Sequence, residues 1–356
     1  MSNDNTSPAV EAGTAHMPAT VTEPDPWGTA SEGAPSAGAP STGVPAKGSS
    51  RVAKGGARSK PKKTPGRMRE ILRKAWANPS GRFGFVLLAL LVIAAVLAPW
   101  ISPHDPVRQT LSATDEAPVW MGGENGYLLG TDSLGRDVLS RILHGLRLSL
   151  VVGIVAATCS AFLGLTLGIL AGWYEDTLGK VLMRLADIQF AVPFVAVGIA
   201  LTAALGPGLV PVLVILSVWG WTTYARTIAN SVSQVKRSDF VTAARTLGAS
   251  TPRIMAKHVA PSVLAPVVVL WSTSAGVLIL AESGLSLLGL GVQAPEFSLG
   301  SMLSDGQVAL RLSWWAVLFP GAALLLIVLA FNMIGDALRD AFNPSSALKP
   351  NNPELV

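Results

Sequence analysis

The chain has 356 residues, of which 50% are hydrophobic and only 14% are charged, with a formal net charge of +5 at pH 7. Soluble domains carry about 25% charged residues, so this composition excludes an ordinary soluble domain and indicates a membrane protein. The single cysteine, Cys159, excludes an intrachain disulfide. Because no Cys/His spacing typical of zinc ligands occurs, we expect no metal site.

The first 80 residues differ from the rest of the chain. Residues 1–50 are rich in Ala, Pro, Gly, Ser and Thr, and such a segment buries too little apolar surface to offset the entropy lost on ordering. Residues 51–74 hold ten Lys or Arg against one acid, Glu70. Because a membrane span follows, the position of this cluster favours contact with anionic membrane lipid over contact with nucleic acid. A pure topology signal explains the same charges, and both interpretations stay open. We therefore predict a disordered tail over residues 1–80 with a basic juxtamembrane segment.

Six apolar runs approach the ~20 residues that a helix needs to cross about 30 Å of hydrocarbon. They are Phe83–Trp100, Leu148–Ala171, Ile188–Leu205, Leu209–Tyr224, Ser262–Leu280 and Trp314–Ile334. The sequence Gly206-Pro207-Gly208 predicts a tight turn between the third and fourth runs, and Pro193 can kink the third. The sequence therefore predicts an all-α membrane protein with six transmembrane helices.

The distribution of Lys and Arg predicts the orientation of these helices. With the N-terminus inside, the cytoplasmic segments hold 22 Lys and Arg and the outer segments hold 5. This bias satisfies the positive-inside rule, so we expect both termini in the cytoplasm. Residues 101–147 and 281–313 are then outer loops, and residues 236–261 form a cytoplasmic loop.

Three glycines in the second run, Gly164, Gly168 and Gly172, stand at four-residue spacing. Residues four apart share one face of a helix, and glycines leave that face bare enough for a second helix to approach closely. We interpret these glycines as a helix-packing surface rather than as a substrate site.

The first outer loop contains the sequence GTDSLGRD, in which Asp132, Arg136 and Asp137 are spaced for a local charge network. Apolar residues at helical spacing follow between Val138 and Leu146, and this pattern predicts an amphipathic helix lying at the outer surface.

The cytoplasmic loop has the pattern of a helix–turn–helix. A first helix is expected from Phe240 to Leu247, and Gly248 suits the left-handed residue that ends a helix. Thr251 is placed to cap a second helix, which we expect to end before Pro261, where the chain turns into the fifth run.

The same loop carries a surface of small residues, formed by Ala243, Ala244 and Gly248 beside Arg245. Short side chains allow close approach, so this surface fits a groove of a partner protein. An ordinary amphipathic cytoplasmic loop has the same composition, and the residues alone leave both interpretations open.

Four blocks of sequence resemble the permease subunits of bacterial ABC importers, in the peptide and nickel branch. They are FVTAARTLGAS…RIMAKHVAP in the cytoplasmic loop, LLGTDSLGRDVLSRILHGLRLSL (Leu128–Leu150), ESGLSLLGLGVQAPEFSLGSML (Glu282–Leu303) and AFNMIGDALRDAFNP (Ala330–Pro344). The general cytoplasmic signature begins with Glu, where Thr242 stands here, and has Leu where Ala260 stands. The blocks follow the order of the C-type permease of dipeptide and oligopeptide importers.

This resemblance implies a type I permease fold over residues 81–345, followed by a cytoplasmic tail over residues 346–356, in a bacterial inner membrane. It implies a second homologous permease, two ABC ATPase subunits and an extracytoplasmic peptide-binding protein as partners. In the family the cytoplasmic loop is a coupling helix that docks on an ATPase subunit. The docking set that this position implies is Asp239, Ala243, Ala244, Arg245, Gly248 and Pro261, with His258 as an interface or structural residue. The outer loop is then a landing surface for the binding protein, or a brace for the mouth of the pathway.

The chain lacks the motifs that catalysis would need. No phosphate-binding loop, H-E-x-x-H or G-x-S-x-G motif occurs, so we expect no enzyme activity and no cofactor, with ATP used by partner subunits. The main alternative is an importer of nickel complexes or other small solutes on the same fold. An ATP-independent secondary transporter is disfavoured because ionisable residues are nearly lacking in the spans. A membrane scaffold that acts through its basic tail is a further alternative.

Overall fold

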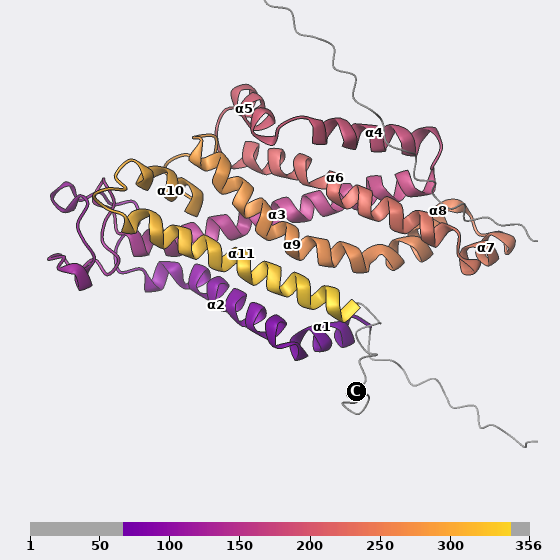
Figure 1. Cartoon of the computed structure of the whole chain (residues 1–356), viewed down its shortest axis with the longest axis horizontal. Coiled ribbons are helices and arrows are strands. Elements are labelled where there is room, and N and C mark those ends of the chain that lie inside the picture. The colour runs from indigo at the N-terminus through magenta and orange to yellow at the C-terminus, as the bar shows by residue number, and fades with distance from the viewer. Residues whose placement is uncertain (1–66, 343–356) are drawn as a thin grey trace, which may run out of the picture. The chain divides into compact units, whose positions relative to one another are not determined.

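The computed structural model describes residues 67–342, which are helical apart from the connecting loops (Figure 1). The predicted tail up to residue 66, which holds most of the basic cluster, and the predicted tail over residues 346–356 lie outside the described residues. Five helices in the described range are long and apolar enough to cross a membrane. They are α2 (Pro79–Ile101), α3 (Val138–Trp173), α6 (Leu209–Lys236), α9 (Ala260–Leu287), which continues the turns from Thr251, and α11 (Trp315–Phe342).

The third predicted span is a bent pair of helices rather than one straight helix. Helix α4 (Thr177–Ala191) and helix α5 (Phe194–Leu205) meet at an angle of 93°, and the pair counts as a sixth span only if both are taken together. Pro193 stands at the N-cap of α5, and it has no N–H to continue the hydrogen bonds of α4. The kink expected at this proline is therefore a break. Gly206 and Gly208, both with positive φ, then turn the chain from α5 into α6.

A short helix, α1 (Arg67–Ala77), precedes the first span within the residues expected to belong to the tail. Its side chains Ile71 and Ala75 are one turn apart and buried against Ala337 and Leu338 of α11. Two apolar residues one turn apart are too few to give a clear helical period in the sequence. The prediction therefore followed the polar, basic composition and included these residues in the disordered segment. The disorder predicted up to residue 80 is therefore wrong for residues 67–77, which form a helix.

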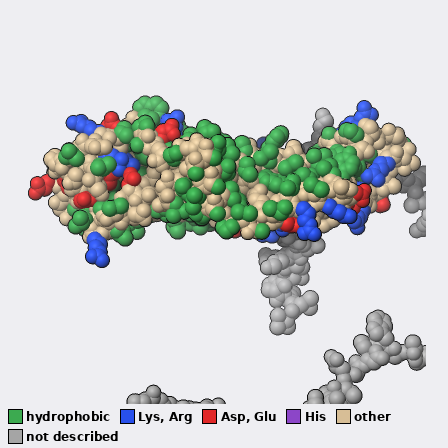
Figure 2. All heavy atoms as spheres, turned by 90° about the horizontal axis from the view of Figure 1, so that it is seen from above, with side chains coloured by type: hydrophobic (Ala, Val, Ile, Leu, Met, Phe, Trp, Pro, Cys, Tyr) green, Lys and Arg blue, Asp and Glu red, His purple; other side chains and the backbone are tan. Residues whose placement is uncertain are grey.

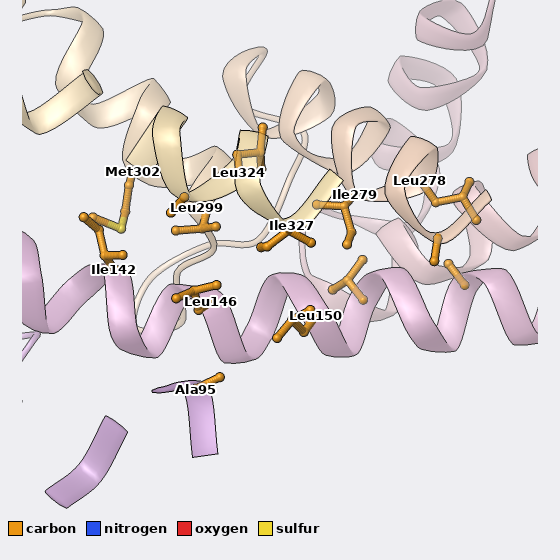
Figure 3. Packing of buried hydrophobic residues seen from close by; sticks show 14 of the residues in the cluster. Ala95, Ile142, Leu146, Leu150, Leu278, Ile279, Leu299, Met302, Leu324 and Ile327 are labelled. Atoms are coloured by element: carbon orange, nitrogen blue, oxygen red, sulfur yellow. The ribbon is translucent and has the colours of Figure 1, made fainter. Parts of the chain in front are cut away.

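The amphipathic helix expected at the outer surface is instead the first part of α3. Asp137 caps this helix by accepting a hydrogen bond from the Ser140 backbone N–H at 3.0 Å. Ile142 and Leu146 point into the main core, where they meet Met302 and Leu299 of α10 (Leu299–Gln307) (Figure 3). The apolar spacing therefore marks a face buried in the core and not a surface face, and the predicted outer loop ends at residue 137, where α3 begins.

Charged side chains gather at the two ends of the face drawn in Figure 2, with hydrophobic side chains between them. The end on the left holds the loop between α2 and α3, with its short 3₁₀ turns (Leu111–Ala113 and Val119–Met121), and α10. The other end holds α7 (Asp239–Thr246) and α8 (Thr251–Ile254). This pattern is the one expected of a chain whose middle lies in hydrocarbon.

Candidate functional site

The segment between α6 and α9, which the sequence predicts to be cytoplasmic and which we call the coupling segment, consists of two short helices joined by a tight turn. Helix α7 ends before Gly248, which has φ of +80°, in the left-handed region that favours glycine. Ser250, rather than the expected Thr251, stands at the N-cap of α8, and Pro252 lies in the first turn. The helix–turn–helix is therefore present, with its second cap shifted by one residue.

The segment does not turn at Pro261 as expected. A π-helical turn, Met255–Val259, joins α8 to α9 without a break, and the Ala260 N–H donates to the Met255 carbonyl. A proline ring clashes with the carbonyl four residues before it, and the wider π turn gives this carbonyl room. The segment is thus a rigid extension of α9.

One side of the segment is anchored in a hydrophobic cluster. Val241, Ile254 and Val259 are fully buried and pack with Ile228 and Val232 of α6. Burying an aliphatic side chain stabilises a fold by about 1.5–3 kcal/mol. The anchor therefore fixes the segment to the C-terminal end of α6.

The opposite side is exposed and partly apolar. Phe240 is 50% exposed and Leu247 is 87% exposed, and Ala243 is exposed beside them. We call Phe240, Ala243 and Leu247, with Gly248, the coupling face. Sequence reasoning missed Phe240 and Leu247 because it searched for small residues only, although two large apolar side chains in a polar loop are themselves a signal.

Ala244 and Arg245 are not free members of this face. Ala244 is half-buried and packs against the anchoring cluster. The Arg245 guanidinium lies 4.8 Å from the centre of the Trp173 ring, at the end of α3. This contact links the segment to α3 as well as to α6.

The remaining predicted docking residues lie around the same segment. Asp239 is exposed in the first turn of α7, where a carboxylate interacts favourably with the helix dipole. The His258 ring lies 6.5 Å from the Phe240 ring. His258 is therefore a neighbour of Phe240 on this segment.

A polar cluster joins the loop after α3 to the end of α6. Ser233 Oγ donates to Glu175 Oε1 at 2.5 Å, and Lys236 Nζ donates to the Trp173 carbonyl at 2.8 Å. The Ser233 hydrogen bond is the main cause that lowers the pKa of Glu175, and the positive charges of Lys236 and Arg237 act in the same direction. Glu175 is therefore held ionised beside the coupling segment.

In the loop between α2 and α3, Asp132 and Arg136 belong to a four-residue charge network that also includes Arg141 and Asp305. Asp132 Oδ2 accepts from Arg136 Nε at 2.7 Å and also from Arg141 Nη1. Asp305 Oδ2, on α10, accepts from Arg136 at 2.9 Å and from Arg141 at 3.2 Å. Sequence reasoning missed Arg141 and Asp305, since nothing local links residues 164 positions apart.

Asp137 lies outside this network. It caps α3, and its Oδ2 accepts from Ser140 Oγ at 2.5 Å and lies 3.6 Å from His104 Nδ1. Its role in the structure is to start a helix, which is a common use of Asp in this position.

Gly164, Gly168 and Gly172 lie where α6 approaches α3. A Cβ added at Gly164 would stand 2.3 Å from Cβ of Tyr224, and one added at Gly172 would stand 2.4 Å from the Ala229 carbonyl oxygen. Backbone contact this close requires glycine. The three glycines thus fix α6, and with it the coupling segment, against α3.

Comparisons with known proteins identify the family to which the chain belongs. Residues 164–347 match the family of binding-protein-dependent transport system inner membrane components, and residues 66–118 match the N-terminal TM domain of oligopeptide transport permease C. A di/tripeptide transport system permease protein of Pseudomonas aeruginosa is 39% identical over 79% of this chain and 93% of its own length.

Two relatives from Bacillus subtilis are also similar. A dipeptide transport system permease protein is 37% identical over 76% of this chain and 84% of its own length. An oligopeptide transport system permease protein is 33% identical over 80% of this chain and 91% of its own length. The chain therefore belongs to the inner membrane components of binding-protein-dependent ABC importers, as a multi-pass, non-catalytic permease of the dipeptide and oligopeptide C type.

Proposed function

We propose that this permease forms half of a translocation pathway for di- or oligopeptides across a bacterial inner membrane. Its relatives named as dipeptide and oligopeptide permeases support the substrate class. A second homologous permease supplies the other half, two ABC ATPases bind below, and an extracytoplasmic binding protein delivers the peptide. The Lys and Arg bias supports a cytoplasmic location for both termini.

The main observation in support of the proposal is that the coupling segment exposes the coupling face on one side and is buried on the other. Phe240 and Leu247 present apolar surface to the solvent, whereas Val241 and Ile254 are fully buried on the other side. Because the segment is anchored to α6 and continuous with α9, a displacement of the coupling face would move both helices rather than deform the segment. We assign the coupling face to the docking groove of an ATPase subunit, and Asp239, Ala244, Arg245, His258 and Pro261 to its support.

For the outer loop we propose that the charge network braces the mouth of the pathway beneath the binding protein. Arg141 has a side chain that is only 3% exposed, so it cannot serve a partner directly. Arg136 and Asp305 are more exposed, at 14% and 46%, and are the members that a docked protein can reach.

A pull-down in mild detergent, followed by identification of subunits by mass, tests the assembly. We expect a tagged chain to recover a second permease and ATPase subunits, and peptide uptake by the reconstituted complex to require ATP. A chain that purifies alone and moves peptide in liposomes without ATP would overturn the proposal in favour of a secondary transporter.

A further inference from the structure

Helix α6 carries a line of exposed polar side chains along its cytoplasmic half. These residues, which we call the polar stripe, are Thr223, Arg226, Asn230 and Gln234. Their spacing of three or four residues places them on one helical face. The opposite face of α6 packs on the glycines of α3. A polar face on a spanning helix is unusual, because hydrocarbon offers its groups no hydrogen bonds.

The same face of α6 is apolar and covered in its outer half. Val212 and Leu216 lie on it and are fully buried. Trp219 follows, and its ring lies 5.1 Å from the Phe194 ring at the start of α5. The face therefore changes from closed and apolar to open and polar about halfway along the helix.

The depth of this change follows from the length of α6. The helix has 28 residues, a length of about 42 Å at 1.5 Å per residue. About 20 residues cross the hydrocarbon, so a span that starts at Leu209 reaches to about Ile228. Thr223 and Arg226 then lie at membrane depth, whereas Gln234 lies beyond it.

An ion pair stands at the upper end of the stripe. Arg226 Nη2 lies 2.5 Å from Asp187 Oδ1 of α4, and the two side chains are 43% and 51% exposed. The guanidinium also lies 4.6 Å from the centre of the Phe190 ring. Charged side chains at this depth are costly against lipid, and those that occur in membrane proteins usually face other protein or a water-filled cavity.

The other edge of the stripe borders a cavity. A hollow of about 580 Å³ between α6, α9 and α11 begins at Thr227, the residue after Arg226. Thr273, Asp336 and Arg339 also line it. Polar groups from four helices, α4, α6, α9 and α11, therefore gather around the cytoplasmic half of α6.

We propose that the polar stripe, with Asp187, lines a water-filled inner half of the peptide pathway. The proposal rests on the importer function above and identifies the surface that a passing peptide meets. Hydroxyl and amide groups suit the peptide backbone, whatever its side chains. The half-exposed Asp187–Arg226 pair offers one charge of each sign to the amino and carboxylate ends of a peptide, and such an exposed pair opens at little cost.

Thiol accessibility tests this surface in the complete transporter. Cys159 is the only cysteine and is exposed, so Cys159→Ala gives a cysteine-free background. Thr223→Cys and Asn230→Cys are then treated with a charged, membrane-impermeant thiosulfonate in inside-out membrane vesicles. We expect these cysteines to react at least about tenfold faster than lipid-facing controls, because the reactive thiolate forms poorly in apolar surroundings.

Two exposed apolar positions serve as matched controls. Val218 is 44% exposed on another face of the same helix, and Leu325 is 64% exposed on α11. Val218→Cys and Leu325→Cys should react slowly. The charged adduct at Thr223→Cys should also reduce peptide uptake, and the treated cysteine-free protein should keep its uptake.

The outcomes separate this inference from the importer function. ATP-dependent uptake with slow reaction at Thr223→Cys and Asn230→Cys would overturn the water-filled stripe and assign this face to the second permease or to lipid. Rapid reaction without ATP-dependent uptake would support the aqueous stripe and contradict the importer function.

Discussion

Ala243, on the exposed side of α7, is the residue at which the coupling role is tested most cleanly. Ala243→Glu adds a charge to the coupling face without touching the buried anchor. We expect normal membrane levels and at least about tenfold lower uptake, the effect of losing about 1.4 kcal/mol of docking free energy. ATP hydrolysis that no longer responds to the binding protein would accompany the loss.

A matched control lies one residue away. Thr242 is exposed and stands where the general signature of the family has Glu, so Thr242→Glu should leave uptake intact. Ala244→Glu is a poorer test, since Ala244 packs against the cluster and the charge would disturb folding. Equal uptake by Ala243→Glu and wild type would contradict the docking assignment.

Gly248 has a φ of +80°, which is strained for any residue with a side chain. An added Cβ would have no atom within 4 Å, so the backbone conformation and not the space limits substitution here. Gly248→Asn keeps the left-handed conformation at small cost, whereas Gly248→Arg adds bulk and charge at the face. We expect uptake to survive Gly248→Asn and to be lost in Gly248→Arg at normal membrane levels. Similar losses in both variants would assign Gly248 to backbone geometry alone.

Arg141 is the member of the outer network whose loss should matter most for stability. It bonds to Asp132 and Asp305 and lies 4.9 Å from the centre of the Phe297 ring. Removing one partner of a buried pair costs about 3–5 kcal/mol. Arg141→Gln should therefore lower the midpoint of thermal unfolding in detergent clearly, and the more exposed Arg136→Gln should lower it less. Equal midpoints in the two variants would contradict the brace.

At the scale of elements, the close contact between α3 and α6 depends on glycines of α3, which have no side chain to separate the two helices. A Cβ at Gly168 would stand 2.8 Å from the Ala225 carbonyl oxygen, whereas Gly284 in α9 has nothing within 4 Å. We expect Gly168→Ala to lower the free energy of unfolding by about 1–3 kcal/mol, the usual cost of overpacking. Gly284→Ala should be neutral or stabilising, and denaturant unfolding of both variants in detergent measures the difference.

The elements also separate what the sequence can predict from what it cannot. Long apolar runs predicted the spans, and Gly248 predicted the turn after α7, because both signals are local. The 93° angle at Pro193 was not predictable, since a proline shows where a helix breaks but not the direction of the next one. Arg141 and Asp305 meet only through the packing of α3 on α10, so no local pattern could pair them.

On the scale of the whole molecule, α6 connects the two proposed working surfaces. Its cytoplasmic end packs with Val241 and Ile254 of the coupling segment, and its middle carries Arg226 of the polar stripe. Because the glycines of α3 hold α6 at close range, we expect a displacement of the coupling face to move the stripe as well, through one stiff helix pair. In the proposed importer, ATP-driven closure would therefore act directly on the inner half of the peptide pathway.

The N-terminal segment provides the last test, because α1 divides it into two parts with different expected roles. The family match begins at residue 66, and α1 follows at Arg67, with Ala75 fully buried and Ile71 7% exposed against α11. Deletion of residues 1–66 should therefore leave membrane level and uptake near normal. Deletion of residues 1–77 should lower both, since it strips the apolar cover from Ala337 and Leu338.

Ile71→Asp tests the same contact without shortening the chain, and Leu72→Asp is its control, because Leu72 is 47% exposed on the neighbouring face. We expect Ile71→Asp to reproduce the longer deletion and Leu72→Asp to behave as wild type, by membrane level and by uptake. If deletion of residues 1–66 alone abolished uptake at a normal membrane level, the tail would be the active part of the chain. The scaffold alternative would replace the importer if Gly248→Arg also kept normal uptake, since the coupling face would then be dispensable.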